Sequence, residues 1–408
     1  MKRKQHKGKA PTIKQAGAGR ALILVTDSFK LGEVLDELGR AARFAFDTEF
    51  VMEDRYEAEV CLIQVATESM VALIDPLADV DCAGFWDLVA DERIEKIVHS
   101  GAEDLALCVQ QIGRPPRNIV DVQIAAGLVG LDYPLSLMKL VRATCKARLH
   151  KSQTLTDWRR RPLTDAQIQY AKNDVAYLPA VHQVIGRKLA KLRRAHWARE
   201  EFERFERPET YQRPEESQVF RLKGAGVLDG RGLAVARELL KVRQEMAKHF
   251  NRPPRVLLKD YLIVEIARLA WTTPEQIRSL RGMQLSNAGV RRLAEAVKRG
   301  VAAAPETWPK SPPSSPTDTA EESALISLAT ALVRTYCHEH DIAYQLAATK
   351  QEIRALVHSF TQGTPAENSR LCGGWRGETV GRLLMTFFAG EQRVAIRRDG
   401  DSVRIVVE

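Results

Sequence analysis

The sequence changes character near Thr164, and this change limits the folds that the chain can adopt. Before it, short apolar runs that resemble strands alternate with segments of helical periodicity, whereas nearly all of the later sequence has the spacing of amphipathic helices. This order predicts an α/β domain with a mixed sheet flanked by helices, followed by two small all-α domains. The expected strands are Ala21–Val25, Arg43–Phe50, Val60–Ala66, Val71–Asp75 and Ile94–Val98.

Shifts in composition divide the 408 residues into five parts. The charged residues 187–209 predict a long solvated helix that joins two domains. In chain order the parts are a basic leader (1–20), the α/β domain (21–210), a first helical domain (225–303), a proline-rich linker (304–320) and a second helical domain (321–408) that ends in a β-hairpin around Asp399-Gly400.

The charge of the chain is concentrated at its start. Lys and Arg number 61 against 52 Asp and Glu, and residues 1–20 hold seven basic residues and no acidic one. Without that leader, 54 basic residues face 52 acidic ones. The leader could attract a phosphate backbone, and a solvated extension is the equally open alternative.

Apolar and cysteine patterns exclude several classes of protein. No apolar run reaches about 18 residues, so no membrane span is expected. The basic start leads into no apolar segment, which argues against a secretory signal. Six dispersed cysteines without a C-x-x-C pair argue against a zinc site and a disulfide framework, and they favour the reducing cytosol.

Asp47-Thr48-Glu49 lies in an expected strand, where residues two apart point to the same face. Asp47 and Glu49 then share one face, and Phe44, Phe46 and Phe50 lie on the apolar face. Two carboxylates on a mostly buried strand are costly unless something neutralises them. A bound Mg²⁺ or Mn²⁺ would do so, because these hard cations prefer oxygen ligands. An exposed sheet face near a strand end is the alternative.

A third carboxylate, Asp104, lies where a helix is expected to begin. Ser100 and Glu103 match the S-x-x-E capping box, which gives Glu103 a structural role and leaves Asp104 in the first helical turn. Helix-end electrostatics alone is the structural alternative for Asp104.

A fourth carboxylate, Asp174, is predicted on a helix that starts near Asp165, because Thr164 and Gln167 form another capping box. Tyr170 and Asp174 are four residues apart and therefore share a helix face. The phenol could hold a water against a metal bound by the carboxylate. A half-buried tyrosine beside a solvated aspartate is the alternative.

Together Asp47, Glu49, Asp104, Tyr170 and Asp174 resemble, in order and local spacing, the catalytic set of the DEDD exonuclease superfamily, Tyr subclass. Roughly residues 20–390 resemble the ribonuclease D family of bacteria. The segments that carry this resemblance are Phe46-Asp-Thr-Glu-Phe50, Leu62-Ile-Gln64, Ala72-Leu-Ile-Asp-Pro76, His99-Ser-Gly-Ala-Glu-Asp104, Asp121-Val-Gln-Ile124, Lys151-Ser152, Thr156-Asp-Trp158 and Arg161-Pro-Leu-Thr164.

The resemblance implies a ribonuclease H-like fold and 3′→5′ hydrolysis of RNA, which trims stable RNA precursors such as tRNA and releases nucleoside 5′-monophosphates. It also implies that Asp47, Glu49, Asp104 and Asp174 hold two Mg²⁺ or Mn²⁺ ions, with no zinc, and that Tyr170 positions the attacking water. Two ions about 3.5–4 Å apart can clamp the attacking and leaving oxygens of an in-line displacement. A cytoplasmic monomer is expected.

Three residues are candidates for contact with RNA. Gln64 could touch the terminal nucleotide, Trp158 could stack on a base, and Arg159 could meet a phosphate. A buried strand is the alternative for Gln64, and a packing role is the alternative for Trp158.

The helical domains resemble the helicase-and-RNase-D C-terminal (HRDC) domain. Leu239, Val242, Pro253 and Leu262 follow its pattern in the first domain. The second domain follows it more loosely, but its Ser369–Glu378 resembles the C-terminal helix of the ribonuclease D family. Such domains suggest nucleic-acid binding or substrate positioning, and a structural brace is the alternative. The basic leader and the C-terminal hairpin depart from the family pattern.

Two other functions remain open from the sequence. The first is a DNA 3′→5′ exonuclease of the same superfamily, although the chain has no G-x-x-x-x-G-K-[ST] motif of a helicase motor. The second is a non-catalytic RNA-binding protein on a nuclease fold, against which the intact set of five residues speaks.

Overall fold

The computed structural model describes residues 20–149, 156–212, 218–310, 317–364, 369–399 and 402–407. Nearly all of the predicted leader, the Lys151-Ser152 segment and residues 311–316 of the predicted linker lie outside this range. The chain forms two compact units: one comprises Met1–Thr48, Leu62–Arg207 and Thr317–Glu408, and the other comprises Glu49–Cys61 and Pro208–Pro316. Within the described ranges, no helix is long and apolar enough to cross a membrane.

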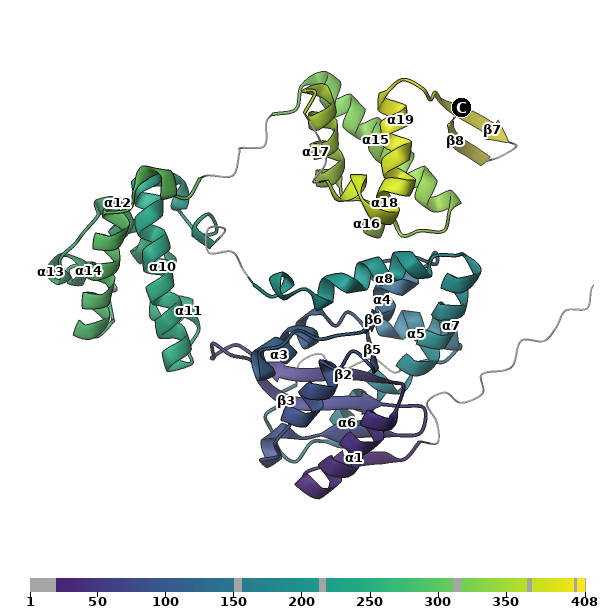
Figure 1. Ribbon diagram of the computed structural model, residues 1–408, viewed down its shortest axis with the longest axis horizontal. Helices are drawn as coiled ribbons and strands as arrows, with labels where there is room; N and C mark the ends of the chain where they lie inside the picture. Colours follow the sequence, from purple (N-terminus) through teal and green to yellow (C-terminus); the bar gives the residue numbers. More distant parts are fainter. Residues whose placement is uncertain are drawn as a thin grey trace, which may run out of the picture. The chain divides into compact units, whose positions relative to one another are not determined.

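A six-stranded mixed sheet forms the α/β domain (Figure 1). Its strands follow the order β1-β4-β3-β2-β5-β6; β1 is parallel to β4, β3 is antiparallel to β4, and β5 is parallel to β2 and β6. The predicted mixed sheet is confirmed. The short strand β6 completes the sheet beside β5, and Asp121 is its last residue. The strands are β1 Leu22–Val25, β2 Arg43–Val51, β3 Glu59–Ala66, β4 Val71–Ile74, β5 Glu95–Val98 and β6 Ile119–Asp121.

Helices flank this sheet, as Figure 1 shows. An aromatic cluster packs one layer of the core, where the rings of Phe44 and Phe46 lie 6.2 and 5.7 Å from that of Phe85. The apolar face predicted for this part of β2 is therefore confirmed. The helices are α1 Ser28–Arg40, α2 Ala83–Val89, α3 Ala102–Ile112, α4 Val122–Gly127, α5 Leu137–Cys145, α6 Asp165–Ala176, α7 Leu178–Lys191 and α8 Ala195–Glu203.

The prediction of one long solvated helix over 187–209 was wrong. The helical stretch breaks between α7 and α8, where Arg193 adopts a left-handed φ of 57°. Arg194 is buried at this break and donates hydrogen bonds to the carbonyl oxygens of Leu128 (2.9 Å) and Asp341 (2.8 Å). Ala198 and Phe202 are buried on α8, so this helix has one apolar face. The many charged residues around it make that face hard to recognise in the sequence.

The first unit also contains a second set of helices and the predicted C-terminal hairpin. Strands β7 (Val394–Asp399) and β8 (Ser402–Val407) pair antiparallel, which confirms the hairpin. The helical elements before it are α15 Ala320–Glu339, α16 Tyr344–Ala347, α17 Lys350–Thr361, η6 Arg370–Cys372, α18 Gly374–Arg376, η7 Gly377–Gly381 and α19 Arg382–Phe388.

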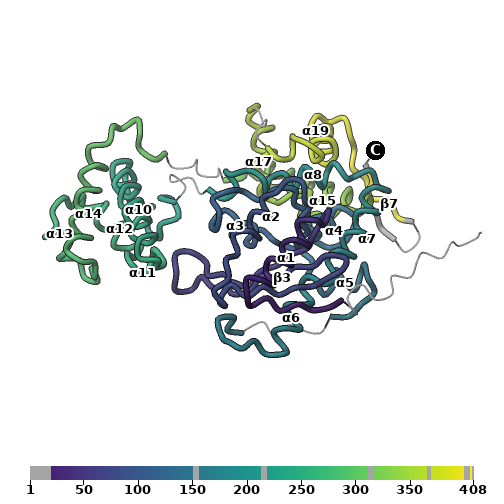
Figure 2. Tube along the Cα trace, turned by 60° about the horizontal axis from the view of Figure 1, so that its bottom comes forward, coloured from purple at the N-terminus to yellow at the C-terminus, as the bar shows by residue number. Residues whose placement is uncertain are grey.

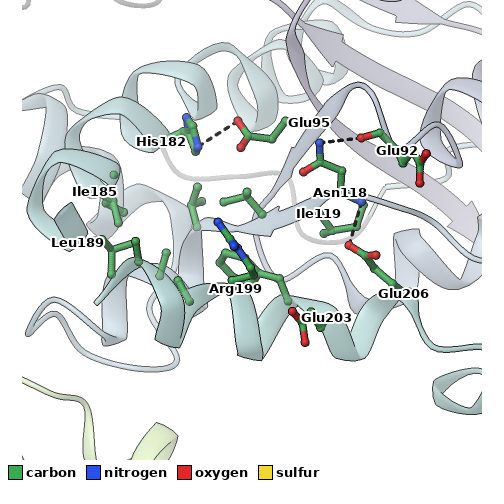
Figure 3. A pocket seen from close by; sticks show the side chains of 17 residues that line it. Glu92, Glu95, Asn118, Ile119, His182, Ile185, Leu189, Arg199, Glu203 and Glu206 are labelled. Carbon is green, nitrogen blue, oxygen red and sulfur yellow. Dashed lines mark hydrogen bonds and ion pairs between the residues drawn. The ribbon is translucent and has the colours of Figure 1, made fainter. Parts of the chain in front are cut away.

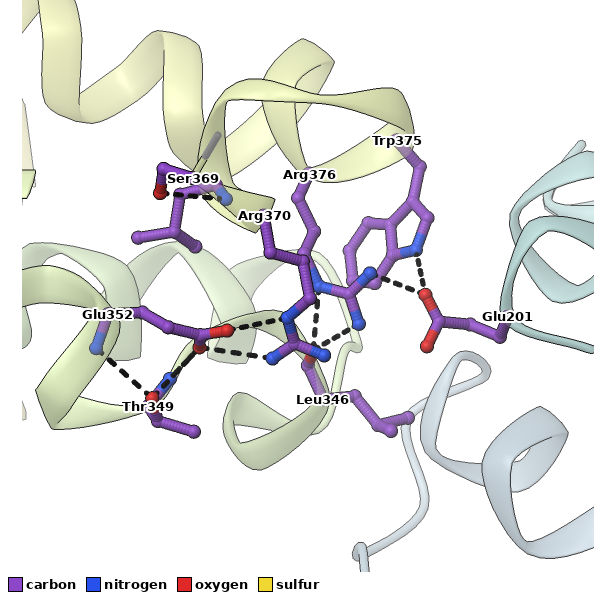
Figure 4. Close-up of polar contacts among 9 residues, drawn as sticks. Glu201, Leu346, Thr349, Glu352, Ser369, Arg370, Trp375 and Arg376 are labelled. Carbon is purple, nitrogen blue, oxygen red and sulfur yellow. Dashed lines mark hydrogen bonds and ion pairs between the residues drawn. The ribbon is translucent and has the colours of Figure 1, made fainter. Parts of the chain in front are cut away.

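A buried ion pair fastens α18 to α8 within this unit (Figure 4). Arg376 is 2% exposed and Glu201 is 5% exposed, and the guanidinium bonds the Glu201 carboxylate. Arg376 also donates to the carbonyl oxygen of Leu346 at 3.1 and 2.7 Å, and the indole N–H of Trp375 donates to Glu201 at 2.8 Å. Trp375 stacks on Trp197 with ring centroids 4.9 Å apart. Because every polar group at this junction is satisfied, the C-terminal helices are held firmly on α8.

The second unit is a helical domain with its own core. Helices α10 and α14 approach closely at Gly300, where a Cβ would lie only 2.4 Å from the Val235 Cα. Part of the predicted linker packs on this domain, because the indole N–H of Trp308 donates to the Ala303 carbonyl at 3.0 Å. Its elements are η4 Ala225–Val227, α10 Gly230–Phe250, α11 Pro254–Leu257, α12 Asp260–Leu269, α13 Pro274–Arg278, α14 Asn287–Val301 and η5 Pro305–Thr307.

Removing the charge of Glu201 should destabilise the first unit strongly. Glu201→Gln leaves the Arg376 guanidinium buried without a counter-charge, and breaking one partner of a buried ion pair costs about 3–5 kcal/mol. Thermal unfolding of the full chain measures this loss. Glu203→Gln is the matched control, because Glu203 lies exposed on the same helix and should change stability by less than about 0.5 kcal/mol. Equal unfolding curves for the two variants would show that the buried pair does not hold the C-terminal helices.

Candidate active site

Strand β2 carries Asp47 and Glu49 two residues apart, with Thr48 between them. Asp47 and Glu49 are partly exposed, whereas Thr48 is buried and its hydroxyl donates a hydrogen bond to Oδ1 of Asp104. The strand periodicity predicted from the sequence therefore holds across the triplet. The hydroxyl of Thr48 thus holds the Asp104 carboxylate next to β2. The sequence analysis did not identify this role of Thr48.

Asp104 lies in the first turn of α3, but the capping box predicted before it is wrong. Helix α3 begins at Ala102, and its N-cap, Gly101, makes no side-chain capping bond. The backbone N–H groups of Ser100 and Gly101 instead donate to the carboxylate of Asp121 at 3.1 and 3.3 Å. Asp121 also caps α4 by accepting from the Gln123 N–H at 2.8 Å.

Burial raises the pKa of the Asp104 carboxyl, while hydrogen bonds, including the one from Thr48, oppose this rise. Because Asp104 is buried at a helix N-terminus, its charged form needs further compensation beyond the helix dipole.

Helix α6 carries Tyr170 and Asp174 one turn apart, as predicted, and it starts with the predicted Thr164–Gln167 capping box. Burial raises the pKa of Asp174 to about 7, and a hydrogen bond from Tyr170 partly offsets this rise. The Oδ2 atom of Asp174 is buried and has no hydrogen-bond partner in the structure. This buried oxygen argues against a fully solvated aspartate, although Asp174 as a whole is partly exposed.

The four carboxylates suit a hard divalent cation. Their donor atoms are all oxygens, the ligands that Mg²⁺ and Mn²⁺ prefer. Two of them, Asp104 and Asp174, are disfavoured in their charged form by burial, and a nearby positive charge would favour that form. The unpartnered Oδ2 of Asp174 offers a lone pair that no protein donor uses. The donor chemistry of these four residues thus fits a bound metal ion.

The three RNA-contact candidates occupy different environments. Gln64 is fully buried on β3, and neither its amide nitrogen nor its amide oxygen has a hydrogen-bond partner, which supports the buried-strand alternative over surface contact. Trp158 is 7% exposed, and its ring lies 6.0 Å from that of Tyr170, which supports the packing alternative. Arg159 is partly exposed.

A separate cavity of about 510 Å³ lies beside β6, α7 and α8 (Figure 3). Its walls are apolar side chains such as Ile185 and Leu189, and carboxylates including Glu203 and Glu206 lie among them. None of the five predicted catalytic residues lines it. This cavity is therefore separate from the predicted catalytic residues.

Comparisons with known proteins agree with this architecture. A family model described as a 3′-5′ exonuclease matches residues 22–190, and one described as an HRDC domain matches residues 232–296. Ribonuclease D of Nitrobacter hamburgensis is 31% identical over 387 residues, which cover 94% of this chain and 99% of the relative. Ribonuclease D of Jannaschia sp. is 32% identical over 371 residues, covering 88% and 93%.

The same fold is found in a solved structure. The crystal structure of Escherichia coli RNase D matches with a TM-score of 0.74 at 24% identity, covering 91% of this chain and 99% of that one. A mixed sheet with an exonuclease match, followed by an HRDC domain, defines a 3′–5′ exonuclease of the DEDD superfamily, whose members typically depend on divalent metal ions. The chain belongs to the ribonuclease D family and is a 3′–5′ exoribonuclease, a hydrolase of RNA.

Thr48→Val should weaken metal binding. Valine keeps the shape of threonine but removes the hydroxyl that donates to Asp104, and loss of such an outer partner typically costs roughly 10- to 100-fold in metal affinity. Calorimetric titration of the full chain with Mn²⁺ measures this change. Thr144→Val is the matched control, because the Thr144 hydroxyl donates only to nearby acceptors on and beside α5. An unchanged Mn²⁺ affinity in Thr48→Val would exclude a role for this bond in ion binding.

Proposed function

We propose that this exoribonuclease trims the 3′ ends of stable RNA precursors such as tRNA and releases nucleoside 5′-monophosphates one at a time. Asp47, Glu49, Asp104 and Asp174 are the proposed ligands of two Mg²⁺ or Mn²⁺ ions, without zinc. The observation that carries the proposal is Asp174, whose buried Oδ2 atom has no hydrogen-bond partner and which lies one turn from Tyr170. The protein is proposed to act as a monomer.

Each residue has a separate proposed role. Bound ions would supply positive charge for the attacking and leaving oxygens and for the phosphoryl group between them. The Tyr170 hydroxyl, which hydrogen-bonds Asp174 in the structure, would orient the attacking water beside the scissile phosphate. Arg159 would contact a phosphate. Trp158 would keep the Tyr170 ring in place rather than stack on a base, because little of its surface is exposed.

The first HRDC domain is the proposed anchor for the RNA backbone. Residues 229–303 hold fifteen Lys and Arg against seven Asp and Glu. Four of these cations, Lys241, Arg291, Arg292 and Arg299, line one hollow between α10 and α14 together with Glu238, Glu245 and Glu295. Lys241, Arg292 and Arg299 form ion pairs with Glu238 and Glu245 there. Phosphate contacts of this kind supply affinity without reading sequence.

The second helical domain, predicted over 321–408, is proposed as an HRDC-like brace. The junction of Arg376 and Glu201 supports this role, because it fixes these helices to α8 of the exonuclease domain. The boundaries of all five predicted parts remain proposals.

Hydrolysis should require Mg²⁺ or Mn²⁺ and act on RNA. The full chain is incubated with a 3′-extended tRNA and, separately, with single-stranded DNA of the same length, and the released nucleotides are separated by chromatography. We expect 5′-monophosphates from RNA, no activity in excess chelator, and recovery when Mg²⁺ is restored. Asp47→Asn is the inactive control, because it removes a charge from the proposed metal site.

Other outcomes of this assay would favour the alternatives. Faster release from DNA than from RNA would support a DNA exonuclease. RNA binding without any release would support a non-catalytic binding protein. Full activity in excess chelator would contradict the metal site itself.

Tyr170→Phe and Asp174→Asn should fail in different ways. Tyr170→Phe keeps the ring and its packing on Trp158 but removes the hydroxyl, so the chemical step should slow by roughly 10²-fold with little change in metal affinity. Asp174→Asn removes a proposed charged ligand and should weaken both Mn²⁺ binding and rate. Single-turnover kinetics and Mn²⁺ calorimetry separate the two effects. A wild-type single-turnover rate for Tyr170→Phe would leave Tyr170 with packing alone.

A further inference from the structure

We propose that Asp75 and Arg161 are positioning residues for the chemical step, because their ion pair holds Trp158 against Tyr170. This inference rests on the proposed role of Tyr170 in orienting the attacking water. Asp75 and Arg161, which are not proposed metal ligands, would then also affect the rate of the reaction.

Asp75 is held in place at the end of β4 by its burial and its hydrogen bonds. It follows β4 directly, its backbone N–H donates to the Val25 carbonyl at 3.0 Å, and the residue is only 4% exposed. One carboxylate oxygen also accepts from the Leu77 N–H at 3.0 Å, which caps the turn η1 (Pro76–Ala78). Backbone and side chain are thus both immobilised by the sheet.

Arg161 links Asp75 to the segment that precedes α6. Its Nε and Nη2 atoms donate to the two carboxylate oxygens of Asp75 at 2.6 and 2.7 Å, which is a two-pronged arrangement that only a guanidinium can make. Its Nη1 atom donates to the Trp158 carbonyl oxygen at 2.8 Å. The backbone of Trp158 is therefore tied to the end of β4 through one side chain.

Trp158 in turn buries its indole against the Tyr170 ring, with the centroids 6.0 Å apart and the planes at 37°. A second tie comes from α6 itself, where the Gln167 amide donates to the Thr156 hydroxyl at 3.1 Å and to the Asp157 carbonyl at 3.4 Å. Bonds at both ends of residues 156–161 therefore hold the backbone from which the indole projects onto the tyrosine ring.

The packing of Trp158 on Tyr170 matters for catalysis because the reaction rate is sensitive to small displacements of the Tyr170 hydroxyl. A group that orients a water must be held within a few tenths of an ångström, and a 1 Å misplacement can cost on the order of 10²-fold in rate. Tyr170 projects from one helix turn, so packing on its ring decides where the hydroxyl points. The Asp75–Arg161 pair sets that packing from outside the helix.

Arg161→Lys is the first test variant. Lysine keeps the charge but cannot bond both Asp75 oxygens and the Trp158 carbonyl at once. We expect a single-turnover cleavage rate on 3′-extended RNA that is roughly 10-fold lower, with RNA affinity and Mn²⁺ affinity changed by less than about 2-fold. Asp75→Asn should give a similar loss, and the double variant should be no slower than the worse single one, because both break the same pair.

Arg160→Lys is the matched control for these variants. Arg160 neighbours Arg161 but is exposed, so its substitution should leave the rate unchanged. Melting temperatures of all variants are compared, and Asp75→Asn, which keeps the size of the side chain, serves if Arg161→Lys does not fold.

The deciding measurement repeats Arg161→Lys in a Tyr170→Phe background. If the ion pair acts through the tyrosine hydroxyl, the second substitution should slow cleavage by less than about 2-fold once that hydroxyl is gone. A full 10-fold loss in that background would overturn the inference, as would a wild-type rate for Arg161→Lys alone. A wild-type rate for Tyr170→Phe is a different result, since it removes the proposed role of Tyr170 itself. The two failures are therefore distinguishable.

Discussion

Burial of negative charge is the constraint on which the exonuclease domain depends. Asp104 is buried and one oxygen of the partly exposed Asp174 is buried, and burial raises the pKa of both carboxyls. An isolated buried carboxylate costs several kcal/mol, and one oxygen of Asp174 has no protein donor to offset this. A well-packed core, centred on rings such as Phe44 and Phe85, can tolerate that cost. The proposed cations would remove it, so stability and activity are coupled through the same site.

The second constraint is placement, and contacts from outside each element provide it. Thr48 ties Asp104 to β2, and Asp121 on β6 holds the turn that precedes α3 through two backbone N–H groups. Arg161 reaches from the segment before α6 to the end of β4. Each tie joins elements that are distant in sequence. A few polar bonds thereby fix the directions of side chains whose own helices would leave them free to shift.

Sequence reasoning succeeded where the determinants are local. The spacing of Tyr170 and Asp174 and the capping box at Thr164 depend on residues within four positions, and the structure confirms both. The S-x-x-E match at Ser100 failed because a carboxylate twenty-one positions away takes the backbone N–H groups instead. The junction of Glu201 with Arg376 spans 175 residues, so no local pattern could indicate it. The same contact explains why α8 is not part of the long solvated helix expected over 187–209, because its Glu201 is buried against the distant Arg376.

The distribution of charge gives the two domains complementary tasks under the proposed function. Residues 21–210 hold twenty-five basic residues against thirty acidic ones, whereas residues 229–303 hold fifteen against seven. Under that proposal the net acidic exonuclease domain would disfavour a phosphate backbone until cations bind, and the net basic HRDC domain would attract it. Affinity for RNA would then depend on salt through the HRDC domain, and turnover would depend on metal through the sheet. The net charge of the chain outside the leader is small, because the negative net charge of the exonuclease domain and the positive net charge of the HRDC domain nearly cancel.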